Sequence, residues 1–528
     1  MEVRFQRANH RTGNESVLLK FEGVLDEQTA CVLVDSGRGV DVSAQMGDDE
    51  HLAGVLVTHA HLDHFRSLGE NAVDGAPVLA AAPTAAVLAE SLSENERNDR
   101  ATGDVAGALD ALEPVTGWRT LLGDDAVRVH PVPAGHAPGA AGFVVEFRDD
   151  GVARRLLVTG DFTRTQTAGY PALPDSLPVD VEAMVVNVAT AEGYERRLHE
   201  TLETTLGRAL DGDRTLLTAG GLSGVHLARL LAAAAGRFSL DVTVRLVGQP
   251  AKLYAALDLP TDAVELTAEY ADPEAVLDAG AVTIAAPETP VDGSAKRLFG
   301  AIEGDADAAL VQVTTGALDP VTGGACTTDA FEVRAHPTEE VVDSVVEGYD
   351  PLHVVVAHEN GPALDAYKDK YASFVWANQD AIEQTLYADG DWQAPPWVSE
   401  RAEQYVYGNT ETTGGTPLSD DERLDASLPA VAADDVLLHA EGIDVARLAE
   451  RFGSTSTGDA SVDADASEDL STVLARLEEI ESLLAARGVL EDRVPVTVEE
   501  FGDRTVLVLP EGVDVDDADD VQVFLDDD

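Results

Sequence analysis

The stretch Thr58-His59-Ala60-His61-Leu62-Asp63-His64 places four potential metal ligands within six residues. It directly follows the apolar run Val55-Leu56-Val57, which predicts a buried strand that ends where the motif begins. Two histidines at i and i+2 project to the same side of extended chain, and the Asp-His pair beyond the turn can face a second ion. Imidazole and carboxylate ligands together are typical of zinc. Histidine is sparse, with 13 in 528 residues, so a cluster of this density is not expected by chance.

Three further polar residues stand at the ends of apolar runs: Asp35 in Val34-Asp35-Ser36-Gly37, His136 in Ala134-Gly135-His136-Ala137-Pro138-Gly139, and Asp161 in Val158-Thr159-Gly160-Asp161-Phe162. Taken singly, each is weak, because a lone His is usually structural and an Asp in a turn is commonly a turn residue. The four motifs in this order resemble the metallo-β-lactamase superfamily, whose hallmark is H-x-H-x-D-H. The resemblance implies an α/β fold of the αββα sandwich type. It also implies that Asp35 orients a ligand from behind the site, as supporting carboxylates do.

The region beyond residue 190 narrows the resemblance. Four segments resemble the β-CASP branch of nucleases, in which an α/β domain interrupts the lactamase fold: Thr218-Ala219-Gly220-Gly221-Leu222, Val313-Thr314-Thr315-Gly316-Ala317-Leu318 with Gly323-Gly324, Ala335-His336-Pro337, and Val356-Ala357-His358-Glu359. The resemblance covers about residues 15 to 395 and includes nucleases of the ribonuclease J and polyadenylation-factor types. RNA-cleaving members carry His at the last of these motifs, whereas DNA-specific members tend to carry Val, so His358 favours RNA.

The resemblance implies a centre of two zinc ions. One zinc would be held by His59, His61 and His136, the other by Asp63, His64 and His358, with Asp161 bridging both. Such a pair can activate a hydroxide for attack on phosphorus and neutralise the developing charge. His336 would be the general acid for the leaving oxygen. A structural interpretation of His336, as a neighbour of a helix N-cap, stays open.

One departure bears on activity. The branch normally has an acidic residue after the strand that here is Met184-Val185-Val186, but the next residue is Asn187, which cannot act as an anion. Glu192 is the nearest substitute, at the wrong spacing. If this motif has degenerated by loss, restoring an acid at the position would raise activity. Arg66 also replaces the glycine that usually follows the histidine motif, and no glycine follows His358.

Hydrophobic patterns predict five segments. On the resemblance, residues 1–190 are the N-terminal part of the lactamase domain, 191–330 the inserted β-CASP domain, and 331–407 the C-terminal return of the lactamase domain. Helix and strand patterns alternate from about residue 195 to 330, which predicts a separate α/β unit with a parallel sheet. Residues 408–467 are predicted to be an acidic linker with a small helical module at about 431–453. Residues 468–528 are predicted to be a helix or short coiled coil, at 468–487, and an acidic tail with a short strand at 505–509. Leu470, Val473, Leu477, Ile480 and Leu484 recur in steps of three and four, so a coiled-coil seam and a simple amphipathic helix both stay open.

The composition is strongly acidic. Asp and Glu number 97 against 35 Lys and Arg, for a net charge of −62 and a pI near 4.2. The acid is spread through segments that look well packed, so disorder does not explain it. In molar salt the Debye length falls to about 3 Å, which screens such self-repulsion. The pattern resembles proteins of salt-accumulating haloarchaea.

Neither a signal peptide nor an apolar run of membrane-spanning length is evident, so we expect a cytoplasmic protein without membrane contact. The two cysteines exclude a thiolate zinc site, and Cys31 reads as a small core residue.

The leading hypothesis is therefore a zinc-dependent ribonuclease that acts on single-stranded RNA. One alternative is a weakly active or inactive paralogue that binds RNA or a partner nuclease, which Asn187 and the tail support. Another is a hydrolase of a small ester or thioester, which the insert disfavours because it would roof a groove rather than a small pocket. We expect an Arg-lined cleft between the two domains to bind phosphates. The C-terminal helix is a candidate for self-association or for docking on a partner protein.

Overall fold

The computed structural model describes residues 1–25, 28–123, 125–368, 370–378, 382–409 and 427–453, and two short strands at 497–501 and 504–508. Residues 1–453 form one compact unit, and residues 454–528 form a second. The helix predicted over 468–487 lies outside the described residues. In the second unit, β22 (Thr497–Phe501) and β23 (Arg504–Val508) pair as an antiparallel hairpin, and the latter overlaps the strand predicted at 505–509.

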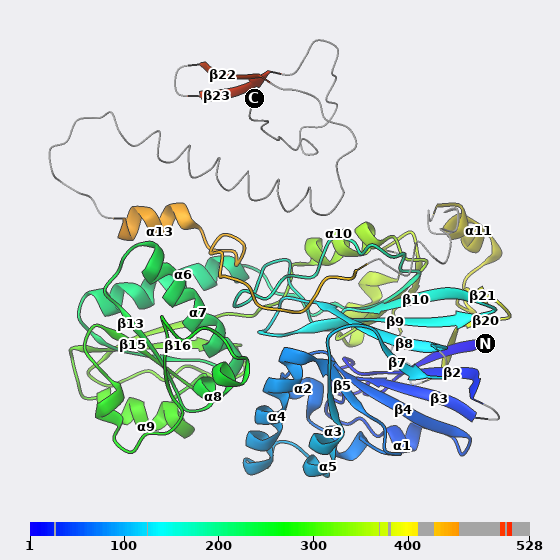
Figure 1. Cartoon of the computed structure of the whole chain (residues 1–528), viewed down its shortest axis with the longest axis horizontal. Helices are drawn as coiled ribbons and strands as arrows, with labels where there is room; N and C mark the ends of the chain where they lie inside the picture. The colour runs from blue at the N-terminus through cyan, green and yellow to red at the C-terminus, as the bar shows by residue number, and fades with distance from the viewer. Residues whose placement is uncertain are drawn as a thin grey trace. The chain divides into compact units, whose positions relative to one another are not determined.

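The first large sheet carries the histidine motif. In the described residues it has eight strands in the order β21-β20-β1-β2-β3-β4-β5-β6 (Figure 1). They are β1 (Glu2–Arg7), β2 (Val17–Leu25), β3 (Gln28–Val34), β4 (Glu50–Val57), β5 (Val78–Ala81), β6 (Leu112–Val115), β20 (Gln384–Ala388) and β21 (Asp391–Trp392). The pairs from β3 to β6 are parallel and the others antiparallel. Strand β4 ends at Val57, so the predicted strand is confirmed and the motif begins at its carboxyl end.

The second large sheet has seven strands within the described residues, in the order β19-β18-β11-β10-β9-β8-β7. They are β7 (Arg119–Leu122), β8 (Val127–Pro133), β9 (Ala141–Asp149), β10 (Val152–Val158), β11 (Ala183–Asn187), β18 (His353–Ala357) and β19 (Phe374–Trp376). Strands β10, β11, β18 and β19 are parallel to one another. Because β11 and β18 are neighbours, the chain leaves this sheet after Asn187 and returns beside the same strand at His353.

The two sheets pack face to face, and helices cover their outer faces. On β3, Ala30, Val32 and Val34 point into the core between the sheets, whereas Cys31 and Leu33 point into the core on the other face. Burial on both faces explains the unbroken apolar runs, and it confirms Cys31 as a core residue. Figure 1 shows α1 (Val42–Gln45), α2 (Leu62–Phe65), α3 (Leu68–Asn71), α4 (Ala82–Arg97) and α5 (Val105–Asp110) outside the first sheet and α10 (Glu339–Tyr349) outside the second. This α/β arrangement with two mixed sheets is consistent with the predicted sandwich.

Between β11 and β18 the chain builds a third sheet. Its six described strands are all parallel and lie in the order β14-β13-β15-β12-β16-β17. They are β12 (Arg214–Thr218), β13 (Thr243–Val247), β14 (Glu265–Thr267), β15 (Ala281–Ala285), β16 (Ala308–Thr314) and β17 (Thr327–Glu332), with helices α6 (Tyr194–Leu210), α7 (Gly221–Arg237), α8 (Gln249–Ala256) and α9 (Gly293–Ile302). The alternation of helix and strand had predicted such a parallel unit. The exact domain boundaries stay predictions.

The chain after the second sheet is less helical than predicted. Helix α11 (Glu400–Asn409) follows β21, and the module expected at about 431–453 contains only α13 (Val445–Phe452) among its described residues. Residues 427–444 have turns but no helix or strand, because their apolar side chains pack on the body instead of on one another. Among the described residues, none of the helices combines the length and the apolar character that a bilayer span needs.

Candidate metal centre

The predicted ligands converge at one edge of the sandwich, where parallel strands of both sheets end. The histidine motif follows β4, Asp161 follows β10, and His358 follows β18. His136 lies in the connection between β8 and β9, and Asp35 follows β3. The carboxyl ends of parallel strands are where open α/β sheets usually place their ligands. The topology therefore gathers residues that lie as much as three hundred positions apart in the sequence.

The first group is formed by His59, His61 and His136. His61 Nδ1 lies 3.1 Å from His59 Nε2 and 2.9 Å from His136 Nε2. Zinc–nitrogen bonds are about 2.0–2.1 Å long, so two ligands of a tetrahedral ion lie about 3.3 Å apart. The three nitrogen atoms thus have nearly the spacing that one zinc ion requires.

The second group is formed by Asp63, His64 and His358, whose ligand atoms all lie within 4.8 Å of one another. The imidazole ring centres of His64 and His358 are 5.3 Å apart. His64 is fully buried, yet its Nε2 has no hydrogen-bond partner among the described residues. A buried nitrogen that makes no hydrogen bond and lies beside a carboxylate and other ligand atoms fits a metal site, because burial of a polar atom without a hydrogen bond is otherwise costly. The Asp63 side chain is 58% exposed, so this group opens to solvent.

Asp161 lies between the two groups. Its Oδ2 is 3.3 Å from His64 Nε2, 3.7 Å from His136 Nε2 and 3.9 Å from His59 Nε2. Its Oδ1 accepts hydrogen bonds from His358 Nδ1 at 2.6 Å and from Asn187 Nδ2 at 3.1 Å. One carboxylate oxygen therefore faces both groups while the other is held from behind. This is the position that a bridging ligand needs.

Asp35 supports the centre from the interior. His64 Nδ1 donates to Asp35 Oδ2 at 2.7 Å, which leaves Nε2 of the same ring directed at Asp161. Thr58 donates to Asp35 through its backbone N–H, at 2.9 Å, and through its hydroxyl. The Thr58 hydroxyl also lies 3.1 Å from His59 Nδ1. Thr58 was not among the residues predicted from the sequence, although its place directly before the motif, at the end of a buried strand, was an available signal.

The electrostatics of the centre favour a bound cation. Burial lowers the pKa of His59 and of His136 well below the ordinary value. Burial also opposes protonation of His64, but the Asp35 and Asp161 carboxylates outweigh it and raise the pKa of His64 well above its ordinary range. Against burial, Asp161 likewise raises the pKa of His358. The field that stabilises these protons would stabilise a divalent ion in their place, since metal binding displaces ligand protons.

His336 reaches the same edge from the segment that returns from the third sheet. Its ring centre is 5.0 Å from that of His136 and 6.3 Å from that of His358. Its Nδ1 is buried without a hydrogen-bond partner among the described residues, and burial lowers its pKa. Thr338 caps helix α10, since the Thr338 hydroxyl accepts from Val341 N, so His336 also stands two residues before a helix N-cap, as the structural interpretation expects. The geometry therefore leaves His336 directed at the centre, where His136, Asp161 and His336 could also share an ion.

The structure gives Asn187 a donor role. Asn187 is buried at the end of β11, and its amide donates to Asp161. Its backbone N–H donates to the Thr159 hydroxyl at 3.1 Å. Glu192, the substitute acid considered from sequence, is exposed and belongs to none of the ligand groups found among the described residues.

Comparison with known proteins agrees with this geometry. A family model described as the metallo-β-lactamase superfamily matches residues 23–209. A search of curated proteins finds no match to the chain. Solved structures similar to it include a protein of unknown function from Enterococcus faecalis V583, with 13% identity, a TM-score of 0.46, and coverage of 68% of this chain and 94% of that one.

Two subclass B3 metallo-β-lactamases are also similar. One, described as having an active-site glutamic acid, has 18% identity and a TM-score of 0.19 over 28% of this chain and 60% of its own. The other, MEM-A1 from a soil metagenome library, has 15% identity and a TM-score of 0.23 over 35% of this chain and 78% of its own. All three TM-scores lie below 0.5, so the family model and the ligand geometry carry the assignment. The chain therefore contains a domain of the metallo-β-lactamase superfamily, whose members are metal-dependent hydrolases.

Proposed function

We propose that the chain is a zinc-dependent phosphodiester hydrolase of the β-CASP type that cleaves single-stranded RNA. One observation carries the proposal. The chain between β11 and β18 folds as a separate parallel α/β sheet, and the segment that returns from it delivers His336 and His358 to the metal edge. An inserted sheet that contributes residues to a lactamase-type centre supports a nuclease better than a small-molecule hydrolase.

The residues present fit two zinc ions. His59, His61 and His136 would hold one, Asp63, His64 and His358 the other, and Asp161 both. When bound, two such ions activate water at neutral pH and neutralise charge on a transferring phosphoryl group. Asp35 and Thr58 keep His64 in the tautomer that presents Nε2. Asn187 and His358 hold the Asp161 oxygen that faces away from the histidines of the first group.

His336 is the residue best placed to hold and move a proton. The half-buried imidazole is neutral at rest because partial burial lowers its pKa. An anionic phosphodiester beside it would favour the protonated ring, since a nearby opposite charge stabilises the charged form. The protonated ring can then donate to the leaving oxygen. Its unpartnered Nδ1 means that the proton is not already committed to another group among the described residues.

A second candidate function is a weakly active or inactive paralogue that binds RNA or a partner nuclease. Asn187 favours it, because an amide that donates to Asp161 supplies neither an acid nor a base at a position where the branch normally carries an acid. The cavity between the sandwich and the inserted domain also lacks the expected row of arginines. Among the described residues that line this one cavity, Arg229 is the single cation, and three aspartates accompany it.

The test is a cleavage assay on the full chain with single-stranded RNA, single-stranded DNA and a small ester. It is run in molar KCl as well as dilute buffer, because a net charge of −62 opposes folding at low salt. We expect about two zinc ions per chain and cleavage of RNA. Asp63→Ala should abolish cleavage without unfolding the protein, because Asp63 is exposed. The matched control is Asp110→Ala, which removes an exposed aspartate on α5, far from the motif in the sequence. This variant should cleave RNA as the wild type does.

Each outcome separates the candidates. If the folded, zinc-loaded wild-type protein binds RNA but cuts neither RNA nor DNA, the enzyme hypothesis fails and the hypothesis of an RNA-binding paralogue takes its place. Cleavage of the ester alone would favour the small-molecule hydrolase. Equal loss of cleavage in Asp63→Ala and Asp110→Ala would remove the assigned role of Asp63.

A further inference from the structure

A segment that the metal chemistry does not use lies across the junction of the sandwich and the inserted domain. We call residues 427–453 the strap. Four of its apolar side chains are buried in the same core as helices α6 and α7: Leu428, Leu438, Ile443 and Leu448. Arg447 of α13 also pairs with Glu203 of α6 at 2.8 Å. The strap is thus a packed part of the fold.

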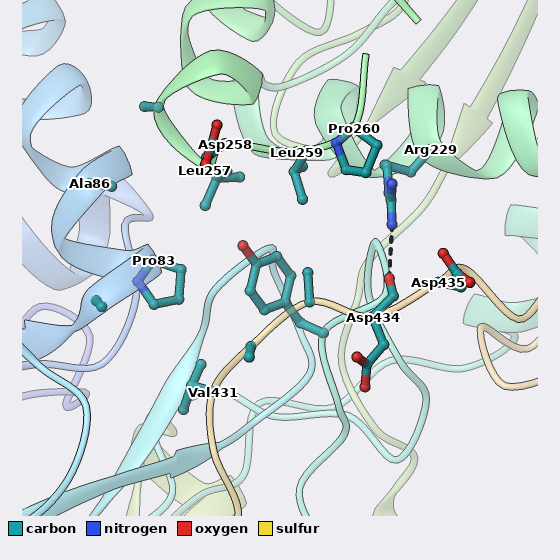
Figure 2. Close-up of a pocket in the computed structure, with 15 residues that line it drawn as sticks. Pro83, Ala86, Arg229, Leu257, Asp258, Leu259, Pro260, Val431, Asp434 and Asp435 are labelled. Atoms are coloured by element: carbon teal, nitrogen blue, oxygen red, sulfur yellow. Dashed lines mark hydrogen bonds between the residues drawn. The ribbon is translucent and has the colours of Figure 1, made fainter. Parts of the chain in front are cut away.

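The first part of the strap forms one wall of a cavity of about 680 Å³. Figure 2 shows Val431 and Asp434 of the strap facing Pro83 of α4 and the loop at 257–260 of the inserted domain. The guanidinium of Arg229, on α7, points at the strap and donates to the Asp434 carbonyl oxygen at 2.9 Å (Figure 2). The Asp434 N–H in turn donates to Gly169 O at 3.0 Å. At this point the strap joins an inserted helix to a loop of the sandwich.

Glu441 makes the second and deeper connection. Its carboxylate has no exposed surface and accepts from His226 Nε2 of α7 at 2.7 Å. It also accepts from the backbone N–H groups of Ala168, at 3.1 Å, and Gly169, at 2.7 Å. The preceding carbonyl, of Ala440, accepts from Gln166 N at 2.8 Å. One buried carboxylate therefore holds a sandwich loop and an inserted helix together.

That loop supports a proposed metal ligand. It begins two residues after Asp161, and the Thr163 hydroxyl accepts from His136 N at 2.9 Å. Further along it, Pro171 O accepts from Gly135 N at 3.1 Å. His136 has a φ of +53°, a left-handed conformation that non-glycine residues rarely adopt without support from their surroundings. The contacts thus run from Glu441 through the loop at 163–171 to the backbone of His136.

Stability alone does not account for this carboxylate. Burying a charge is costly, and a well-packed apolar residue at such a position often serves stability equally well. What a carboxylate adds is a set of directed acceptors, which place two backbone N–H groups and one imidazole at defined positions.

We propose that Glu441 is a positioning residue of the metal centre, which holds the loop at 163–171, and through it His136, in register with the inserted domain. The inference rests on the proposed function in one respect, that the centre binds zinc. Removing the carboxylate leaves the two loop N–H groups and His226 without acceptors, so the loop and His136 lose their fixed geometry. Supporting groups of this kind typically change metal affinity by roughly 10–100-fold.

The test compares two strap variants of the full chain in molar KCl. Glu441→Ala removes the acceptors, whereas Leu448→Ala loosens the strap by a cavity and leaves the loop contacts intact. Zinc affinity is measured by competition with a chromophoric chelator, the absorption spectrum of the cobalt-substituted protein reports ligand geometry, and thermal unfolding is followed on the same samples. We expect Glu441→Ala to weaken zinc binding by roughly 10-fold and alter the cobalt spectrum. Leu448→Ala should lower Tm without either change. Glu441→Gln keeps one acceptor oxygen but sets its amide N–H groups against a loop N–H donor, so it should recover only part of the affinity.

Equal weakening of zinc binding by Leu448→Ala and Glu441→Ala would show that the strap acts through fold stability, and would overturn the proposal. Full zinc affinity in Glu441→Ala beside a zinc-binding wild type would overturn it while leaving the proposed function intact. A wild-type chain that binds no zinc would overturn both.

Discussion

The metal edge of the sandwich and the corresponding edge of the inserted sheet have the same topology but opposite chemistry. At the metal edge, parallel strands β4, β10 and β18 are each followed by candidate metal-ligand residues. At the inserted edge, β12, β15 and β16 are followed by Ala219-Gly220, Ala286-Pro287-Glu288 and Thr315-Gly316. Within the part of the chain that the structure describes, every candidate ligand group lies at the metal edge.

The one acid among those inserted loops ties them together. The Glu288 carboxylate accepts from the backbone N–H of Thr315 at 3.0 Å and from its hydroxyl at 3.2 Å. The Glu288 carbonyl accepts from the Thr218 hydroxyl at 2.7 Å. A place at the carboxyl end of a parallel strand therefore does not by itself give a residue a chemical role. The residue types at that edge decide whether a metal or catalytic site forms there. The inserted sheet contributes to the centre through the segment that leaves it, which carries His336.

The largest expected effect tests that contribution. His336→Ala should slow RNA cleavage by roughly 10²–10⁴, the usual worth of a general acid, and leave the zinc content unchanged. Single-turnover kinetics with metal analysis of the same samples would measure both. His51→Ala, at the opposite end of β4, is the control and should have no effect on turnover. A loss of zinc in parallel with the loss of rate would instead make His336 a ligand with His136 and Asp161.

A smaller effect is expected from Asn187→Asp, which should lower the stability of the protein at neutral pH. The sequence motif suggests instead that this substitution restores activity. The new carboxyl would be buried beside Asp161, so its folded-state pKa should lie above its unfolded value. Such a group binds more protons in the folded state, so the free energy of unfolding should fall, relative to the wild type, as pH rises above about 4, by at most about 1.4 kcal/mol per pH unit. Urea unfolding at several pH values would measure the difference. Higher activity with no such pH dependence would show that the acid is tolerated and that the motif degenerated by loss.

The smallest effect is expected at the inserted edge. Glu288→Gln removes a charge that holds exposed loop groups, so KM for RNA should change by no more than about fivefold, the equivalent of ~1 kcal/mol for an exposed charged contact. The value of kcat should not change. Steady-state kinetics beside His336→Ala would measure the contrast. A fall in kcat comparable to that of His336→Ala would show that the inserted edge takes part in chemistry, and would end the distinction between the two edges.

The sequence by itself predicted what depends on local pattern. The run Val55-Leu56-Val57 had to be a buried strand, and the dense histidine motif after it had to lie at a strand end, because both signals are contained in ten residues. The alternation of helix and strand after residue 195 likewise predicted a parallel sheet. The ligand types by themselves indicated zinc, whereas RNA and the catalytic role of His336 came from the family resemblance; all three remain proposals.

Only the tertiary structure decided which residues meet. His358 lies beside His64 because β18 returns next to β11, and Asn187 became a donor because Asp161 ends the adjacent strand. Nothing local marks Glu441, which is one of 97 acidic residues in a chain where most are expected to be solvated. Its role appears only when folding removes water from it and brings His226, Ala168 and Gly169 to its oxygens, because burial and hydrogen-bond partners are set by contacts between distant parts of the chain.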